Sequence, residues 1–215
     1  MKKLKIIYED KYLIVVFKPA NILTISTETE KENTLFHEVS TYEKKKFKGN
    51  KVFIVHRLDK ETSGLIIFAK SPKVKNILQE NWQNVKRIYI ALLEGKLEGK
   101  GKIESYLKET KTMLTYSTKN HKEGQYACTK YQALKSSNKY TLVEIEILTG
   151  RKNQIRVAFN TLHHPIVGDK KYSTIKDNES RLFLHANRLK MYYPEIRKDI
   201  LFETSTPNEF KKIMN

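Results

Sequence analysis

The sequence is short of the features that mark secreted and membrane proteins. Cys128 is its only cysteine, so no intrachain disulfide can form, and this usage suits a reducing cytoplasm. No apolar run approaches the roughly 20 residues that a membrane-spanning helix needs. The first ten residues carry lysines but neither a long apolar stretch nor a small-residue cleavage site, unlike a secretory signal. We therefore expect a cytoplasmic protein with no membrane partner.

Acidic residues are also scarce. Lys and Arg together number 41 against 24 for Asp and Glu, so the formal net charge is +17. The chain has 215 residues, 39% of them hydrophobic, and is long enough to bury a core beneath such a surface. A protein this basic attracts polyanions, of which RNA and DNA are the commonest. Because lysine dominates over arginine, a generally lysine-rich composition is the plainer alternative.

The apolar pattern predicts both strands and helices. Runs with strand-like composition lie at residues 4–18, with a turn near Asp10 and Lys11, and at residues 64–69, 87–93 and 140–148. Ser71 followed by Pro72 predicts the start of a helix whose apolar residues continue to position 85, and residues 153–162 predict a short helix. Strands and helices do not alternate regularly, which favours an α+β fold with a largely antiparallel sheet.

One polar segment leads directly into an apolar run. Residues 56–70 read His-Arg-Leu-Asp-Lys-Glu-Thr-Ser-Gly-Leu-Ile-Ile-Phe-Ala-Lys. Asp59 lies in the polar part beside Arg57, and a loop anchored on a buried strand is a good place to hold a reactive side chain. Taken alone, an aspartate that caps a turn and pairs with Arg57 is the plainer interpretation.

The whole segment resembles the signature of RNA pseudouridine synthases of the RluA type. In that family His-Arg-Leu-Asp, two variable residues, Thr-Ser-Gly and a strand ending in Ala-Lys follow in order, and every fixed element is present here. Further matching segments lie at residues 8–10, 18–20, 87–91, 127–131, 148–157 and 165–169, and at Tyr172, residues 184–186, Leu189, Pro207 and Phe210. The resemblance therefore covers nearly the whole chain.

Three positions depart from the family pattern. Asn21 replaces a usual glycine, Arg87 a common lysine and Asn153 a usual histidine. Asparagine is the non-glycine residue that best tolerates positive φ, so we expect the turn at Asn21 to survive. At Asn153 we expect a local hydrogen bond that differs from the one made by the family's usual histidine.

The resemblance implies the pseudouridine synthase catalytic fold, a mixed and mostly antiparallel central sheet flanked by helices, with the active-site cleft across the sheet. It also implies isomerisation of uridine to pseudouridine in RNA, which needs no cofactor because no atom is gained and no electron leaves. It assigns the essential carboxylate to Asp59, the arginine that holds it charged to Arg156, and a ring stacked on the uracil to Tyr89. From the residues alone, Arg156 reads as a solvated helix residue and Tyr89 as core packing.

A paired or stacked uridine must be flipped out before it can react. Arg57 is a candidate to fill the vacated space or hold the displaced nucleotide, and Arg151 to contact phosphate. Leu65 and Ile155 are candidates for the apolar wall of the pocket. The remaining predicted RNA-binding residues are His56 and Thr62.

We predict no metal site. His163 and His164 lie near Asp169 in the sequence, but adjacent residues on a helix point in different directions. The sequence also contains neither a Walker pattern nor a dinucleotide-binding glycine turn.

Two other functions stay open at this point. A non-catalytic RNA-binding protein would explain the charge but not the set of Asp59, Tyr89 and Arg156. A hydrolase that releases uracil would use a similar carboxylate but must admit water. We expect one catalytic domain over residues 1–215, without a separate N-terminal RNA-binding module, acting as a monomer with no protein partner. Large-subunit ribosomal RNA is the first expected target and transfer RNA the second.

Overall fold

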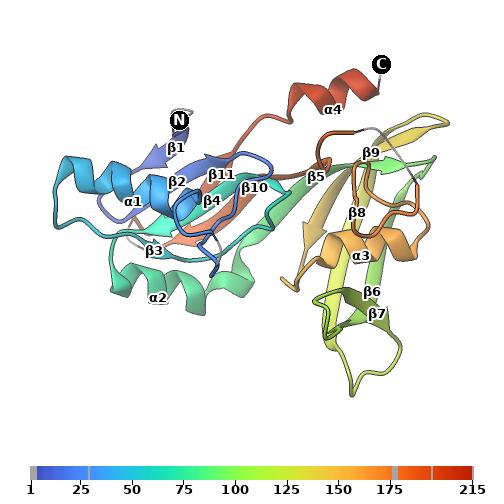
Figure 1. The fold of residues 1–215 in the computed structure, drawn as a ribbon, viewed down its shortest axis with the longest axis horizontal. Coiled ribbons are helices and arrows are strands. Elements are labelled where there is room, and N and C mark those ends of the chain that lie inside the picture. The colour runs from blue at the N-terminus through green and yellow to red at the C-terminus, as the bar shows by residue number, and fades with distance from the viewer. Residues whose placement is uncertain (1–3, 29, 176–178, 195, 215) are drawn as a thin grey trace. The chain divides into compact units, whose positions relative to one another are not determined.

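The computed structural model describes residues 4–28, 30–175, 179–194 and 196–214. The chain divides into two compact units (Figure 1). The first unit comprises Met1–Val85 and Ala186–Ser205, and the second comprises Lys86–His185 and Thr206–Asn215. The prediction of one catalytic domain over residues 1–215 stays a prediction.

The first unit is a sheet with two helices. Its elements are β1 (Ile6–Glu9), β2 (Leu13–Lys18), α1 (Leu35–Lys46), β3 (Phe53–Ile54), β4 (Ser63–Ala69), α2 (Pro72–Glu80), the 3-10 turn η1 (Trp82–Asn84), β10 (Leu184–Tyr193) and β11 (Lys198–Glu203). The strand order is β1-β2-β4-β10, with β3 added to β4 and β11 to β10. Strand β4 is buried along its whole length, so it is the central support for the segment that precedes it.

Local signals in the sequence explain the ends of several of these elements. The Asp10 carboxylate accepts hydrogen bonds from the backbone N–H groups of Tyr12 and Leu13, both at 2.8 Å, which closes the predicted turn between β1 and β2. The Ser71 hydroxyl accepts from the N–H of Val74 at 3.3 Å, with proline at the first helical position, so α2 begins where predicted. It ends at Glu80, earlier than its apolar pattern indicates, because the chain continues into the 3-10 turn.

The second unit is an antiparallel sheet with two helices. Its elements are β5 (Lys86–Glu94), β6 (Lys100–Glu109), β7 (Thr115–Thr118), β8 (Gln125–Ser136), β9 (Tyr140–Ile147), α3 (Gln154–Thr161) and α4 (Asn208–Ile213), in the strand order β5-β9-β8-β6-β7. Strand β9 alternates between partly and fully buried residues, and its buried Val143 and Ile145 pack with Phe159 of α3 in one core. This packing fixes α3, which carries Arg156, against the sheet.

The predicted α+β class with a mostly antiparallel sheet is confirmed, since every described strand pairing with a resolved register is antiparallel. Within the described ranges, no helix is both long enough and apolar enough to cross a membrane.

Candidate active site

The loop that carries Asp59 is fixed by its backbone. Thr24 contacts Leu58 twice: its hydroxyl donates to the Leu58 carbonyl at 2.8 Å and accepts from the Leu58 N–H at 3.2 Å. The N–H of Thr62 donates to the carbonyl of Asp59 at 3.1 Å and closes a turn. Thr62 is buried, whereas the Asp59 side chain is only partly buried. The loop therefore presents its carboxylate from a constrained backbone.

A buried lysine supports the same loop from beneath. The Lys18 side chain is fully buried at the end of β2, and its ammonium donates to the carbonyls of Pro19 at 3.0 Å, Ile22 at 2.6 Å and Lys60 at 2.8 Å. Carbonyl oxygens offset part of the cost of taking an ammonium out of water. Lys18 thus ties the turn after β2 to the residue that follows Asp59.

Gly64 joins this loop to β4 and must be glycine. Its φ is +126°, and an added Cβ would lie 2.2 Å from the carbonyl oxygen of Ala186 in the neighbouring strand. No L side chain fits so close to backbone. The loop therefore enters the sheet through a conformation that only this glycine allows.

The other predicted residues of this segment differ in their surroundings. His56 accepts a hydrogen bond at Nε2 from the N–H of Ile67 at 3.1 Å, and its ring stacks on Trp82 with centroids 4.3 Å apart. Arg57 is exposed, which suits contact with RNA. Leu65 is fully buried in the core of the first unit. These contacts give His56 and Leu65 supporting roles in the fold, and their contacts with RNA stay predictions.

Arg156 is held by a buried carboxylate. Its Nε and Nη2 donate to the two carboxylate oxygens of Asp169 at 2.9 and 2.7 Å, and both side chains are almost completely buried. Its Nη1 donates to the Asn153 side-chain oxygen at 3.4 Å. Asn153 is the position at which a different local hydrogen bond is expected, because the family usually has histidine there. The guanidinium also lies 5.1 Å from the centre of the Tyr172 ring. The interpretation of Arg156 as a solvated helix residue is therefore wrong.

Asp169 is itself held in place. The N–H groups of Lys171 and Tyr172 donate to its Oδ1 at 3.0 and 3.1 Å. The Tyr172 hydroxyl in turn accepts from the N–H of Thr115 at the start of β7, at 3.2 Å. The guanidinium plane of Arg156 is thus set by contacts that reach from α3 to β7.

The turn before α3 is organised by one buried amide. The Gln154 side chain donates to the carbonyl of Cys128 and the hydroxyl of Thr129, both at 3.0 Å, and its oxygen accepts from the hydroxyl of Thr149 at 2.7 Å. The same oxygen accepts from the N–H of Arg151 at 3.0 Å. Arg151 is exposed, as its predicted phosphate contact requires.

The predicted catalytic residues belong to different structural units and elements. Asp59 lies in the first unit, whereas Tyr89 on β5 and Arg156 on α3 lie in the second, so their convergence on one substrate stays a prediction. Tyr89 packs at the edge of the core of the second unit, to which Ile155 also belongs. The roles of Tyr89 as a stacking ring and of Ile155 as a pocket wall likewise stay predictions.

Sequence reasoning missed three positioning residues, Lys18, Gln154 and Asp169. Each lies inside a segment that matches the family, which was the available signal. Their burial was not apparent, because lysine, glutamine and aspartate are mostly exposed in proteins.

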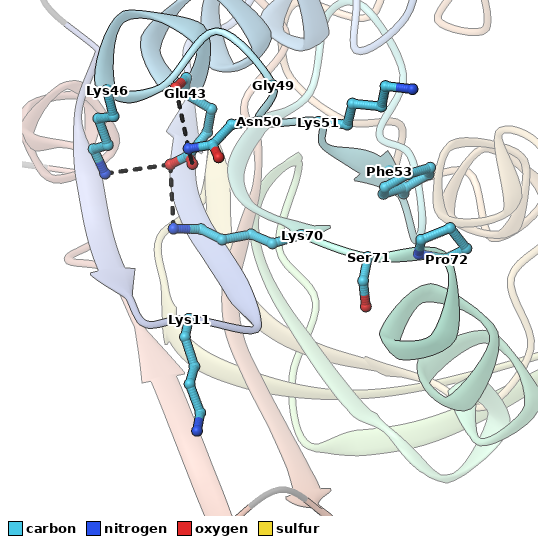
Figure 2. Close-up of a pocket in the computed structure, with 10 residues that line it drawn as sticks. All are labelled: Lys11, Glu43, Lys46, Gly49, Asn50, Lys51, Phe53, Lys70, Ser71 and Pro72. Carbon is cyan, nitrogen blue, oxygen red and sulfur yellow. Dashed lines mark hydrogen bonds and ion pairs between the residues drawn. The ribbon is translucent and has the colours of Figure 1, made fainter.

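The first unit also contains a pocket of about 470 Å³ lined by charged side chains, several of which are drawn in Figure 2. Lys46 and Lys70 lie 3.3 and 3.2 Å from the carboxylate of Glu43, and both also contact Glu9. Burial acts to raise the pKa of Glu9, but hydrogen bonds from Lys46, Lys70 and Tyr42 outweigh it and lower the pKa to about 2. These charges are largely paired with one another, so the cluster reads as a stabilising network.

Among the described residues, no group of three or more His, Cys, Asp or Glu side chains is placed to hold a metal ion. His164 contacts the backbone instead, with Nδ1 2.9 Å from the carbonyl oxygen of Glu94.

The fold defines the class of protein first. Two solved structures, Human RNA Pseudouridylate Synthase Domain Containing 4 and Domain Containing 1, superpose with TM-scores of 0.81 and 0.80 at 23% identity. Each alignment covers 96% of this chain, with 90% and 84% of the human chains respectively. The chain therefore has the pseudouridine synthase fold.

Sequence similarity then establishes the family. The family model described as RNA pseudouridylate synthase matches residues 12–161. The chain is 30% identical to tRNA pseudouridine synthase C of Haemophilus influenzae, over 99% of this chain and 97% of that protein. It is 34% identical to the RNA pseudouridine synthase YhcT of Bacillus subtilis, over 98% of this chain and 71% of that protein. The chain belongs to the RNA pseudouridylate synthase family and is an enzyme that isomerises uridine to pseudouridine in RNA.

Proposed function

We propose that the protein converts a specific uridine of transfer RNA to pseudouridine, with Asp59 as the essential carboxylate. The support for Asp59 is its position in the family signature, on a loop that Lys18 and Thr24 fix to the sheet. A loop fixed in this way can hold a carboxylate in one orientation while the substrate moves.

The isomerisation breaks the bond between C1′ and N1 and forms one between C1′ and C5. Asp59 either attacks the sugar as a nucleophile or removes a proton from it, and both routes need the ionised carboxylate. N1 gains a proton and C5 loses one, so atoms and electrons balance without a cofactor or a metal. The uracil must stay bound while it turns.

Arg156 and Tyr89 complete the proposed catalytic set. We propose that Arg156, whose guanidinium plane is fixed by Asp169, keeps the carboxylate of Asp59 charged and oriented. Tyr89 stacks on the uracil and moves a proton at C5. Stacking can retain the detached base, because the contact need not break when the ring rotates in its plane.

We propose that the target uridine is flipped out of the RNA, at a cost of about a few kcal/mol that binding in the pocket partly offsets. Arg57 and Arg151 are both exposed and take the displaced nucleotide and the phosphates. His56 and Thr62 hold the shape of the loop around the nucleotide, and Leu65 and Ile155 form its apolar wall. We expect the protein to act in the cytoplasm as a monomer.

Transfer RNA is favoured over large-subunit ribosomal RNA, which the sequence placed first. The support is the match to tRNA pseudouridine synthase C, which extends over nearly the full length of both proteins. Relatives with broader names, such as the RNA pseudouridine synthase of Bacillus subtilis, are longer than this chain.

The proposal is tested by incubating the protein with unmodified transfer RNA transcripts and, separately, with large-subunit ribosomal RNA transcripts. We expect mass-neutral conversion of uridine in transfer RNA. Release of free uracil, or conversion of ribosomal RNA alone, would contradict the proposal.

The role of Asp59 is tested with two variants of the same loop. Asp59→Ala should abolish conversion, a loss of at least about 1,000-fold, while the RNA dissociation constant stays nearly unchanged. The matched control Glu61→Ala removes a carboxylate two residues away and should keep conversion. Full turnover by Asp59→Ala would reject the assigned role.

A further inference from the structure

Arg87 is a buried cation for which the described residues supply little compensation. It lies on β5 and is 6% exposed. Its Nη2 donates to the carbonyl of Leu148 at 3.2 Å, and its Nε is buried without a hydrogen-bond partner in the described part of the chain. Across the described ranges, no carboxylate lies within ion-pair distance of it. An unpaired guanidinium at such a depth is costly, so it calls for an explanation.

Two other arginines of the same unit, the buried Arg156 and the partly buried Arg181, each have a carboxylate partner. Arg156 has the bidentate carboxylate of Asp169, and Arg181 has Glu209 at 2.8 Å. Burial lowers the pKa of both Arg87 and Arg181, but only for Arg181 does a carboxylate, that of Glu209, oppose this. Among the described residues, Arg87 thus differs from both of these arginines because it has no carboxylate partner.

The absence of a side chain at Gly150 leaves the guanidinium of Arg87 uncrowded on that side. An added Cβ at Gly150 would come within 3.1 Å of Nη1, so a side chain there would crowd the guanidinium. Arg87 and Tyr89 are two residues apart on one strand and therefore lie on the same face of the sheet. Burial lowers the pKa of Arg87 and the phenol group of Tyr89 opposes this, as expected of neighbouring side chains. Arg87 is accordingly next to the ring to which we assign the uracil.

We propose that Arg87 binds a phosphodiester group of the RNA strand beside the target uridine. A planar guanidinium donates two parallel hydrogen bonds to phosphate oxygens, and the bound phosphate supplies the missing negative charge. The inference rests on the proposed function, because it takes the anion from the RNA that Tyr89 engages. The proposed phosphate contact at Arg87 is a substrate contact in addition to the roles proposed for Asp59 and Arg156.

The first experiment measures binding of a fluorescein-labelled uridine decamer at several KCl concentrations. Arg87→Gln should weaken binding by about 10- to 100-fold at low salt, and the slope of log K against log salt should fall by about one. Arg87→Lys keeps the positive charge but loses the planar pair of donors. Its affinity should therefore lie between those of the wild type and Arg87→Gln. The matched control Arg181→Gln, which removes an internally paired arginine, should bind like the wild type.

The second experiment separates phosphate from base. Uridine, uridine 3′-monophosphate and uridine 5′-monophosphate compete with the labelled decamer for wild type and Arg87→Gln. At least one monophosphate should lose its advantage over uridine in the variant, while uridine itself competes equally well with both proteins. An equal loss for uridine would overturn the phosphate assignment.

A folded Arg87→Gln protein with wild-type affinity and salt slope would overturn the inference. Should Arg87→Gln fail to fold, Arg87→Lys decides the matter by affinity alone, because it keeps the charge and therefore the salt slope; wild-type affinity in that variant would overturn the inference. Binding does not depend on turnover, so the outcome stands apart from the conversion assay. A wild-type protein that never converts uridine would reject the proposed function and leave the phosphate site testable.

Discussion

Replacing Lys18 with methionine removes the ammonium beneath the Asp59 loop and keeps a side chain of similar length. The three carbonyls of Pro19, Ile22 and Lys60 lose their charged donor at 3.0, 2.6 and 2.8 Å. Because Lys18 is fully buried, no water replaces the ammonium without a shift of the surrounding backbone. The loss should therefore appear both in stability and in the order of the loop.

The expected cost follows from these contacts. Each hydrogen bond from a charged donor contributes about 1.5–3 kcal/mol net. Two effects reduce the sum: burying methionine avoids the desolvation of an ammonium, and a shift of the backbone can let water reach the carbonyls of the partly exposed residues. We expect Lys18→Met to lower the free energy of unfolding by about 2–4 kcal/mol. For a chain of this size, the melting temperature should fall by roughly 4–16 °C.

The assay combines urea unfolding with hydrogen exchange. In Lys18→Met, the amides of Leu58 and Thr62, which donate to the Thr24 hydroxyl and the Asp59 carbonyl, should exchange faster than in the wild type. Lys60→Met is the control, because it removes an exposed ammonium and keeps the carbonyl that Lys18 contacts. A Lys18→Met protein that unfolds within about 0.5 kcal/mol of the wild type, with unchanged exchange in the loop, would refute the reasoning.

Two further predictions concern paired charges. The folded-state pKa of Glu9 is about 2, below its ordinary 4.5, so its stabilising effect is present above pH 4.5 and is lost as the pH falls towards 2. Glu9→Gln should lower the free energy of unfolding at pH 6 by about 1–2 kcal/mol after allowance for solvent screening, and its difference from the wild type should be smaller at pH 3; a difference that does not change with pH would contradict this. Asp169→Asn leaves the buried Arg156 without its counter-charge and should cost about 3–5 kcal/mol in unfolding experiments. If the variant remains folded, its kcat for uridine conversion should fall with little change in RNA affinity, and an unchanged kcat would show that Asp169 does not position Arg156.

Features with a local chemical cause were predictable from the sequence. The turn at Asp10, the start of α2 at Ser71 and Pro72, and the positive φ of Asn21, which is 67°, each depend on one or two residues. Such signals act over a few positions and do not depend on the rest of the fold. They located turns and a helix start on either side of the Asp59 loop.

Elements with weak apolar patterns were not predictable to the same degree. Strand β8 has no fully buried residue in its second half and contains an irregularity in its pairing between Ala133 and Lys135, which breaks the period of two. Helix α1 buries only Leu35, Val39 and Glu43, which is too sparse a stripe for a confident pattern. The remaining local feature that marks this helix is Thr34, whose side chain caps its start.

The sequence indicated the catalytic residues of the site but not the residues that hold them in position. The resemblance assigned Asp59, Tyr89 and Arg156 by position in a motif. The groups that fix them are buried Lys18, Gln154 and Asp169, whose partners include backbone carbonyls and amides that any sequence supplies. Such contacts arise only from the folded backbone, and no spacing in the sequence encodes them.

Three buried cations in the described part of the chain have different internal partners, and this difference separates a structural role from a ligand-binding one. Lys18 is surrounded by three carbonyls, and Arg156 faces a carboxylate, so the protein itself supplies negative partial or full charge to both. Arg87 has one carbonyl among the described residues. A cation that serves only the fold gains from such internal partners, whereas one that binds a ligand must keep its charge available until the ligand arrives. On this argument Arg87→Met should unfold at or above the wild-type melting temperature while binding the uridine decamer less tightly, and a large loss of stability with unchanged binding would place Arg87 with Lys18 instead.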